Sequence, residues 1–530
     1  MSETLSNLEN SLHKNTFWNE YRSFCSNLHQ EDIDVDQLIH LLPDIFKQIE
    51  NNALSYQIYN AVNKFCESSP DKGLDLLRKI KANDSTEILT LIPSVMDGIS
   101  KSDSTFNKFT EAELLLENNS DELKKQGYAF LITLTDEEFI QKNDFKDFIY
   151  NLIKTDIENN NSIFFSQISR MLGQFFKIIP DADEYLISLS KSRSQDVLYQ
   201  IVRILSYEIN YQNNPGLYTA ILFNFIAIDP EYHLIISQLN YSVLQKLIAD
   251  SPESIEKFLQ EWLLFDTKRA GKILVFSDAV QQLHEKNSAY FIKMVTMWLN
   301  SDQPVLHAAI SKLLMEIPHY EFKDLALDED YIDGLSPKDI QFIVAKIVGY
   351  IYFKELMRSS IFSILKIKID DKECVAFLKA IFNDYVVFNY PSTIEYLEEE
   401  KRKSSQKVQR VIAEIIEVNK NYYEKINQLD FINEFNPSDK RLKIYNSIYQ
   451  KGFQIKQKTA AESKDSFLSL CKNIQLRTGK GMFSKYKGQY TEKTEMSRIE
   501  YSAEFPRGEF IDAIGQEKIR AVYRTYKREI

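Results

Sequence analysis

The chain has 530 residues, 44% of them hydrophobic and 26% charged, and a formal net charge of −12. This composition is that of a globular protein and excludes a wholly disordered chain. Only 14 Gly and 13 Pro are present, which leaves little turn chemistry for hairpins and argues against an all-β fold. The first residues lack the apolar core of a secretory signal, and the longest apolar run, 217–228, is too short to span a bilayer. We therefore expect a cytoplasmic protein that contacts no membrane.

From about residue 35 to 420, apolar residues recur at spacings of three and four, which is the period of an amphipathic helix. The segments 36–49 and 340–353 show this pattern clearly, and 340–353 is apolar on most sides, as expected of a buried helix. Ser-Pro pairs at 69–70, 251–252 and 336–337 place a capping hydroxyl before a proline, a common way to begin a helix. These patterns predict an all-α fold.

Chain breaks such as Asn119-Ser120 and Pro180-Asp181 fall at intervals of about 15–20 residues, so a pair of helices takes about 30–45 residues. In this spacing the region 35–420 resembles HEAT and armadillo arrays. The resemblance implies a helical-hairpin, α-solenoid-like array whose extended surface binds partners and carries no chemistry of its own. An irregular multi-helix globule is the alternative.

Charge divides the chain. Residues 401–530 hold 27 Lys and Arg against 16 Asp and Glu, a net of +11, whereas residues 1–400 carry a net of −23. We therefore expect an acidic α-helical body over 1–430 and a basic extension over 431–530. Within the extension, 498–505 alternates polar and apolar residues and predicts a strand, so we expect minor β structure there. Residues 517–528 predict a closing amphipathic helix with a basic end.

A basic and aromatic run lies within residues 440–490 of the extension. Its cations could neutralise phosphates and its rings could stack on bases, as single-strand binders require. The candidate nucleic-acid-binding residues are Arg477, Lys480, Phe483, Lys485, Tyr486, Lys487 and Tyr490. The same features suit a loop that docks on the acidic body or on a protein partner, and the residues leave both options open.

No catalytic, metal-binding or cofactor-binding pattern emerges from the sequence. Arg22 and His29 fit the loose Arg-x(4–6)-His spacing of the HEPN ribonucleases, a resemblance that implies a metal-independent ribonuclease but one that chance also produces. Cys25 and His29 could share a helix face, but no second pair completes a zinc site. The four cysteines lie far apart, so we expect reduced thiols.

These observations favour a non-enzymatic scaffold or adaptor that binds a protein partner. A nucleic-acid-binding component acting through the extension is the first alternative, and a HEPN-like ribonuclease is the second. The Asn-, Lys- and Ile-rich composition associates the nucleic-acid alternative with bacterial antiviral defence or toxin–antitoxin loci.

Overall fold

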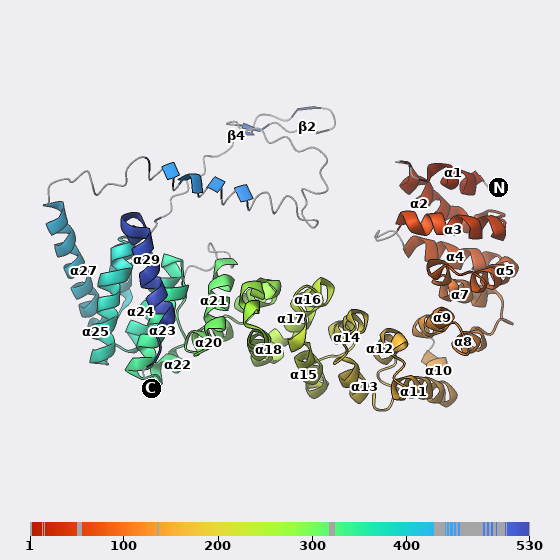
Figure 1. Cartoon of the computed structure of the whole chain (residues 1–530), viewed down its shortest axis with the longest axis horizontal. Coiled ribbons are helices and arrows are strands. Elements are labelled where there is room, and N and C mark those ends of the chain that lie inside the picture. The colour runs from red at the N-terminus through yellow and green to blue at the C-terminus, as the bar shows by residue number, and fades with distance from the viewer. Residues whose placement is uncertain are drawn as a thin grey trace. The chain divides into compact units, whose positions relative to one another are not determined.

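A computed structural model describes residues 3–12, 14, 16–49, 56–134, 137–316, 324–428, parts of 440–495, 504 and 506–528. The chain divides into two compact units, Met1–Asp266 and Thr267–Ile530. Figure 1 shows the helices and strands of both units.

The regular elements of unit 1 are all helices within its described residues. Its elements are α1 (Glu3–Ser11), α2 (Phe17–Asn27), η1 (Leu28–Gln30), α3 (Val35–Ile49), α4 (Tyr56–Ser68), α5 (Pro70–Lys81), α6 (Thr86–Leu89), α7 (Ile92–Ser102), α8 (Lys108–Leu116), α9 (Asp121–Ile132), α10 (Glu137–Ile140), α11 (Asn143–Glu158), η2 (Ser162–Phe164), α12 (Phe165–Gln174), α13 (Ala182–Leu189), α14 (Gln195–Tyr207), α15 (Pro215–Asn224), η3 (Phe225–Ala227), α16 (His233–Gln238), the π-helix η4 (Leu239–Val243), α17 (Leu244–Asp250) and α18 (Pro252–Phe265).

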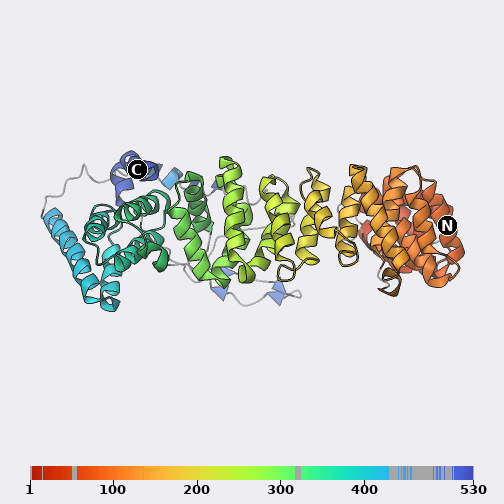
Figure 2. The same ribbon diagram turned by 90° about the horizontal axis from the view of Figure 1, so that it is seen from below.

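The helices of unit 1 form two layers (Figure 1). One layer runs α2, α4, α7, α9, α12, α14 and α16, each helix packed on the next, and we call it the first layer. The other layer includes α13, α15 and α18. Figure 2 shows neighbouring helices of the yellow and orange region standing side by side. Each helix buries the apolar stripe that faces the other layer and leaves its polar stripe on the surface, which is why a spacing of three and four dominates the sequence.

Two glycines allow three helices to pack closely near the start of unit 1. Cys66 of α4 is buried between Gly73 of α5 and Gly98 of α7. A Cβ at Gly98 would lie 2.3 Å from the carbonyl oxygen of Asn63, and a Cβ at Gly73 would lie 2.8 Å from Cγ1 of Ile99. A side chain larger than hydrogen fits at these contacts only if the neighbouring atoms shift.

Unit 2 continues with helices. Its elements are the 3₁₀-helix η5 (Thr267–Phe276), α19 (Ser277–Lys286), α20 (Ser288–Leu299), α21 (Pro304–Glu316), α22 (Glu329–Asp333), α23 (Pro337–Tyr350), α24 (Lys354–Ile367), α25 (Lys372–Ile381), the π-helix η6 (Phe382–Val387), α26 (Thr393–Lys403), α27 (Gln406–Asn427), the short strands β1 (Gly481–Met482), β2 (Lys485–Tyr486), β3 (Gln489–Tyr490) and β4 (Thr494–Glu495), and α29 (Arg507–Thr525). The helices α21, α23, α25 and α27 pack in order, as do α20, α22 and α24.

Helix α23 lies at the centre of unit 2 and buries most of its side chains. Its start confirms the Ser-Pro signal, because the Ser336 hydroxyl accepts from the amide of Asp339 while the Asp339 carboxylate accepts from Ser336, a complete capping box. The helix ends at Tyr350, so the last three residues of the predicted segment 340–353 are not helical.

The segment 504–528 packs back across α23 (Figure 1). Its helix α29 is bent at Asp512, where φ is −150° and ψ is 90°. The amine of Lys346 donates to the carbonyl oxygens of Arg524 and Tyr526 at 2.8 and 2.7 Å. The basic end of the extension therefore contacts the helical array directly.

Among the described residues of the extension, the strands form two isolated pairs, β1 with β4 and β2 with β3, and each strand has two residues. Apart from Glu504, the expected strand over 498–505 lies outside the described residues. The minor β structure of the extension and its boundary at 430 and 431 therefore remain predictions.

The all-α fold is confirmed for the described part of residues 35–420, which contains no strand. Helices begin at Pro70, Pro252 and Pro337, as the Ser-Pro pairs predict. The apolar run 217–228 lies in α15 and η3, apart from its last residue, Ile228. Among the described residues no helix combines the length and the apolar character that crossing a bilayer requires.

Candidate binding surface

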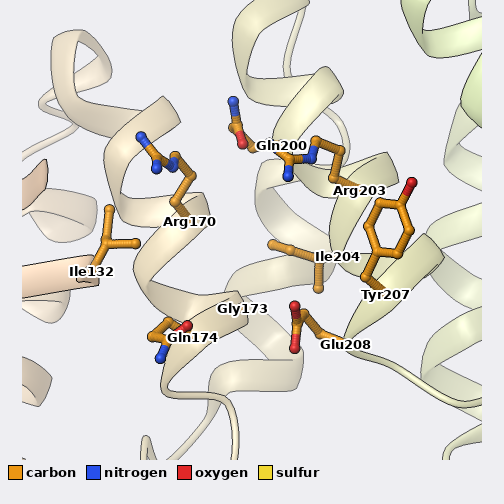
Figure 3. A pocket seen from close by; sticks show the side chains of 9 residues that line it. All are labelled: Ile132, Arg170, Gly173, Gln174, Gln200, Arg203, Ile204, Tyr207 and Glu208. Atoms are coloured by element: carbon orange, nitrogen blue, oxygen red, sulfur yellow. The ribbon is translucent and has the colours of Figure 1, made fainter. Parts of the chain in front are cut away.

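A pocket of about 160 Å³ opens between α12 and α14 of unit 1 (Figure 3). Helix α12 contributes Arg170 and Gln174, and helix α14 contributes Gln200, Arg203 and Tyr207. The remaining lining residues are Ile132, Gly173, Ile204 and Glu208. Two cations, two amides and one carboxylate, that of Glu208, thus line one small hollow.

The close approach of the two helices explains this arrangement. Ile204 is buried and packs on Gly173, where a Cβ would lie 2.7 Å from Cγ1 of Ile204. One helical turn before Gly173 stands Arg170, and one residue before Ile204 stands Arg203. The glycine contact therefore brings the two arginines to the same rim of the pocket, as Figure 3 shows.

Neither arginine has an ion-pair partner within the described part of the chain. Partial burial, which removes water from the guanidinium, lowers the pKa of Arg170, and the positive charge of Arg203 lowers it further. A guanidinium is still fully charged at neutral pH. Because a nearby cation and partial desolvation both disfavour this charge, an anion bound between the two arginines would relieve the repulsion.

Large exposed side chains continue from the pocket along the first layer. The Tyr207 hydroxyl donates to Oε1 of Gln238 on α16 at 3.5 Å. Leu234 stands one turn before Gln238 on α16, and Tyr241 follows in η4, three residues after Gln238. Tyr207, Leu234 and Tyr241 are 63%, 69% and 59% exposed. We call Arg170, Gln174, Gln200, Arg203, Tyr207, Leu234, Gln238 and Tyr241 the α12–α16 surface.

A second hollow of about 480 Å³ adjoins the first and shares Gly173, Gln174 and Glu208 with it. Its lining adds aromatic side chains from the end of α12, Phe175 and Phe176. The α12–α16 surface is therefore indented on both sides of Gln174. Arg170 and Arg203 line the first hollow, and Phe176 and Lys177 line the second.

The sequence-predicted nucleic-acid residues lie largely outside the described residues. This holds for Arg477, Lys480, Phe483 and Lys487. Lys485 and Tyr486 form β2 and Tyr490 ends β3, where the structure describes the backbone alone. Their assignment to nucleic acid stays a prediction.

Arg22 lies on α2, and His29 lies on η1, the turn that follows it directly. Arg22 lines a hollow of about 330 Å³ between α2 and α4, together with Cys25 and Lys64. His29 is not among its lining residues, and the His29 ring lies 3.2 Å from the side-chain nitrogen of Gln30. Burial raises the pKa of Cys25 to about 12, so this thiol stays protonated at neutral pH. Among the described residues, no three His, Cys, Asp or Glu side chains gather closely enough to hold a metal ion.

Sequence analysis alone did not identify Arg170 and Arg203. A usable signal exists, since they stand 33 residues apart, within the predicted length of one helix pair. Residues one repeat apart occupy equivalent positions on successive helices of a layer. Basic residues at that interval would have pointed to this surface.

Comparison with known proteins identifies no family. No family model matches the chain, and no curated protein matches it. Among solved structures, an engineered protein from a structural genomics consortium is similar over 78% of this chain and 98% of its own length, at 13% identity and a TM-score of 0.22. A likeness at this TM-score supports no argument, so the fold assignment rests on the helices themselves.

Proposed function

We propose that this protein is a non-enzymatic adaptor, an α-solenoid of the HEAT or armadillo kind that holds an acidic segment of a partner protein on the α12–α16 surface. The observation that carries the proposal is the pair of unpaired arginines, Arg170 and Arg203, on adjacent helices beside exposed Tyr207. Arginine and tyrosine are the residue types that most often dominate protein interfaces.

The charge of the protein favours a peptide carboxylate over a nucleic-acid phosphate as the ligand. Residues 1–400 carry a net charge of −23. A nucleic acid brings one charge with every nucleotide and is repelled along its whole length. A peptide can present one or two carboxylates to the arginines and neutral residues elsewhere. Gln174, Gln200 and Gln238 can also donate to and accept from a peptide backbone.

Fluorescence anisotropy with two labelled peptides tests the proposal. One 12-residue peptide carries Glu at every third position, and the other carries Gln at the same positions. We expect the intact protein to bind the Glu peptide more tightly. Arg170→Gln with Arg203→Gln should weaken this binding by about 1–2 kcal/mol, about five- to thirtyfold in Kd, because each exposed charge pair contributes up to about 1 kcal/mol.

The control replaces two other exposed cations of unit 1, with Lys191→Gln and Arg193→Gln, and should leave binding unchanged. A labelled single-stranded RNA of 12 nucleotides tests the nucleic-acid alternative in the same assay. Equal binding of the Glu and Gln peptides would refute the proposal. Tight RNA binding that survives the loss of both arginines would instead favour the basic extension as a nucleic-acid-binding element.

A further inference from the structure

The contact between the segment 504–528 and α23 has a regular chemistry. Arg520 and Arg524 stand four residues apart on α29, which aligns their side chains along one stripe of the helix, and Arg528 follows three residues after the helix ends at Thr525. Each guanidinium faces an aromatic ring of the array. The Cζ atom of Arg520 lies 3.9 Å from the ring centre of Tyr352, and that of Arg528 lies 4.3 Å from Phe342. Arg524 lies 5.9 Å from the ring centre of Tyr350. We call this surface of unit 2, centred on α23, the arginine groove.

Hydrogen bonds fix the segment in the arginine groove. Arg520 donates to the carbonyl oxygen of Ile351 at 3.2 Å, and Nε of Arg524 donates to that of Gly349 at 2.9 Å. These carbonyls lie at the end of α23, where a helix leaves its acceptors unsatisfied. In the opposite direction, the amine of Lys346 donates to the carbonyl oxygens of Arg524 and Tyr526, at the end of the segment. Side chains of each element thus donate hydrogen bonds to backbone carbonyls of the other.

Further contacts extend the arginine groove in both directions. Glu504 accepts from the amine of Lys354 at 2.6 Å, and the amide of Gly508 donates to Oδ1 of Asn389 at 2.9 Å. At the other end, Nε of Arg528 lies 3.3 Å from Oδ1 of Asp339, and Arg528 donates to Asn300. All of the groove residues lie within 300–392, so the segment and its site are separate stretches of chain.

We propose that the arginine groove is an exchange site, at which the segment 504–528 of a second copy of this chain can replace the segment of the same chain. The replaced contact would be chemically identical, so exchange costs little beyond the loss of the intramolecular connection. The stretch of chain that joins α27 to the segment is long enough to permit this exchange. Between Gln428 and Glu504 the sequence has 75 residues, which span about 250 Å when fully extended at about 3.3 Å per residue. In dilute solution a chain docks its own segment, because the connection keeps the effective concentration of that segment at the groove high. Exchange between chains can therefore be measured when one chain is unable to dock its own segment.

Two complementary variants of the full chain test the exchange. The first, Arg520→Ala with Arg524→Ala and Arg528→Ala, weakens the segment and leaves the groove intact. The second, Gly349→Ala, blocks the groove, because a Cβ there would lie 3.0 Å from the backbone nitrogen and 2.9 Å from Cγ of Arg524. Lys346→Met is an alternative groove variant that removes the donor for the carbonyls of Arg524 and Tyr526.

Sedimentation velocity of each variant alone and of their equimolar mixture gives the readout. We expect a species with the mass of two chains in the mixture, in excess of what either variant forms alone. The matched control replaces Gly349→Ala by Gly271→Ala, where nothing lies within 4 Å of an added Cβ. That chain keeps its own segment docked and should form at least fivefold less of the mixed species.

Two outcomes would overturn the proposal. The first is a mixture that contains only the species of the separate variants, with both variants folded by circular dichroism. The second is an equal amount of mixed species when the first variant also carries Gly349→Ala, since this would place the contact outside the groove.

Discussion

The packing of Gly98 allows a sharp test of the close helix contacts in unit 1. In an exposed helix, Gly→Ala stabilises by about 1 kcal/mol through helix propensity. At Gly98, however, the new Cβ would lie 2.3 Å from the carbonyl oxygen of Asn63 and 2.9 Å from Cβ of Cys66. Ordinary contact needs about 3.5 Å, so α4 and α7 must separate by about 1 Å. Neither obstacle is the flexible end of a side chain that could rotate away.

Overpacking of this kind costs about 1–3 kcal/mol. Because the clash involves a backbone oxygen, the cost should lie in the upper part of that range, about 2–3 kcal/mol. The gain of about 1 kcal/mol in helix propensity offsets part of it, which leaves a net destabilisation of about 1–2 kcal/mol. We expect amide hydrogen exchange in α4 and α7 to become about five- to thirtyfold faster, since local opening sets its rate. Gly216→Ala is the control, because nothing lies within 4 Å of its added Cβ. Equal exchange rates in α4 and α7 for the two variants would refute the reasoning.

Further predictions concern buried polar groups. Tyr128→Phe removes the buried hydroxyl that donates to Asp156 and should lower the free energy of unfolding by about 1–3 kcal/mol, as measured by urea denaturation, whereas Tyr56→Phe at an exposed position should not. Burial raises the pKa of Cys66 and of Cys374 to about 12, so iodoacetamide at pH 8 should modify both thiols only in denaturant. Rapid modification of the native protein, seen by peptide mass spectrometry, would contradict this. Because these thiols ionise near pH 9 when unfolded, the unfolded chain loses protons first, and the urea midpoint should fall between pH 9 and pH 12. A midpoint that is unchanged between pH 8 and pH 10.5 would count against it.

The helices of the array were predictable because their signals are local. The apolar pattern of 36–49 became α3, Val35–Ile49, and the Ser-Pro pairs marked helix starts since proline fixes a helical φ. Side-chain capping by the serine of each pair was not general, however. Ser336 caps its helix through its side chain, but the Ser251 hydroxyl contacts Glu253 and Ser254 instead.

The contacts between distant elements were not predictable. The closing helix was expected over 517–528, but α29 begins at Arg507 because a bend at Asp512 joins two helical pieces. The charge pattern left open that the extension docks on the acidic body, but it did not identify Arg520, which is 2% exposed, as a residue of the contact. A sequence pattern records which face of a helix is apolar or charged. It does not record which element, 175 residues earlier, will cover that face.

That separation has a consequence during protein synthesis. Arg524 donates to Gly349, 175 residues before it. At about 5–20 residues per second, a ribosome needs about 10 to 35 s to add these residues. The aromatic rings of α23 are thus made well before the arginines that cover them, while α23 itself folds within microseconds once released. Neighbouring ribosomes on one message carry chains at different stages, so a finished 504–528 segment and an uncovered α23 of a younger chain are present together.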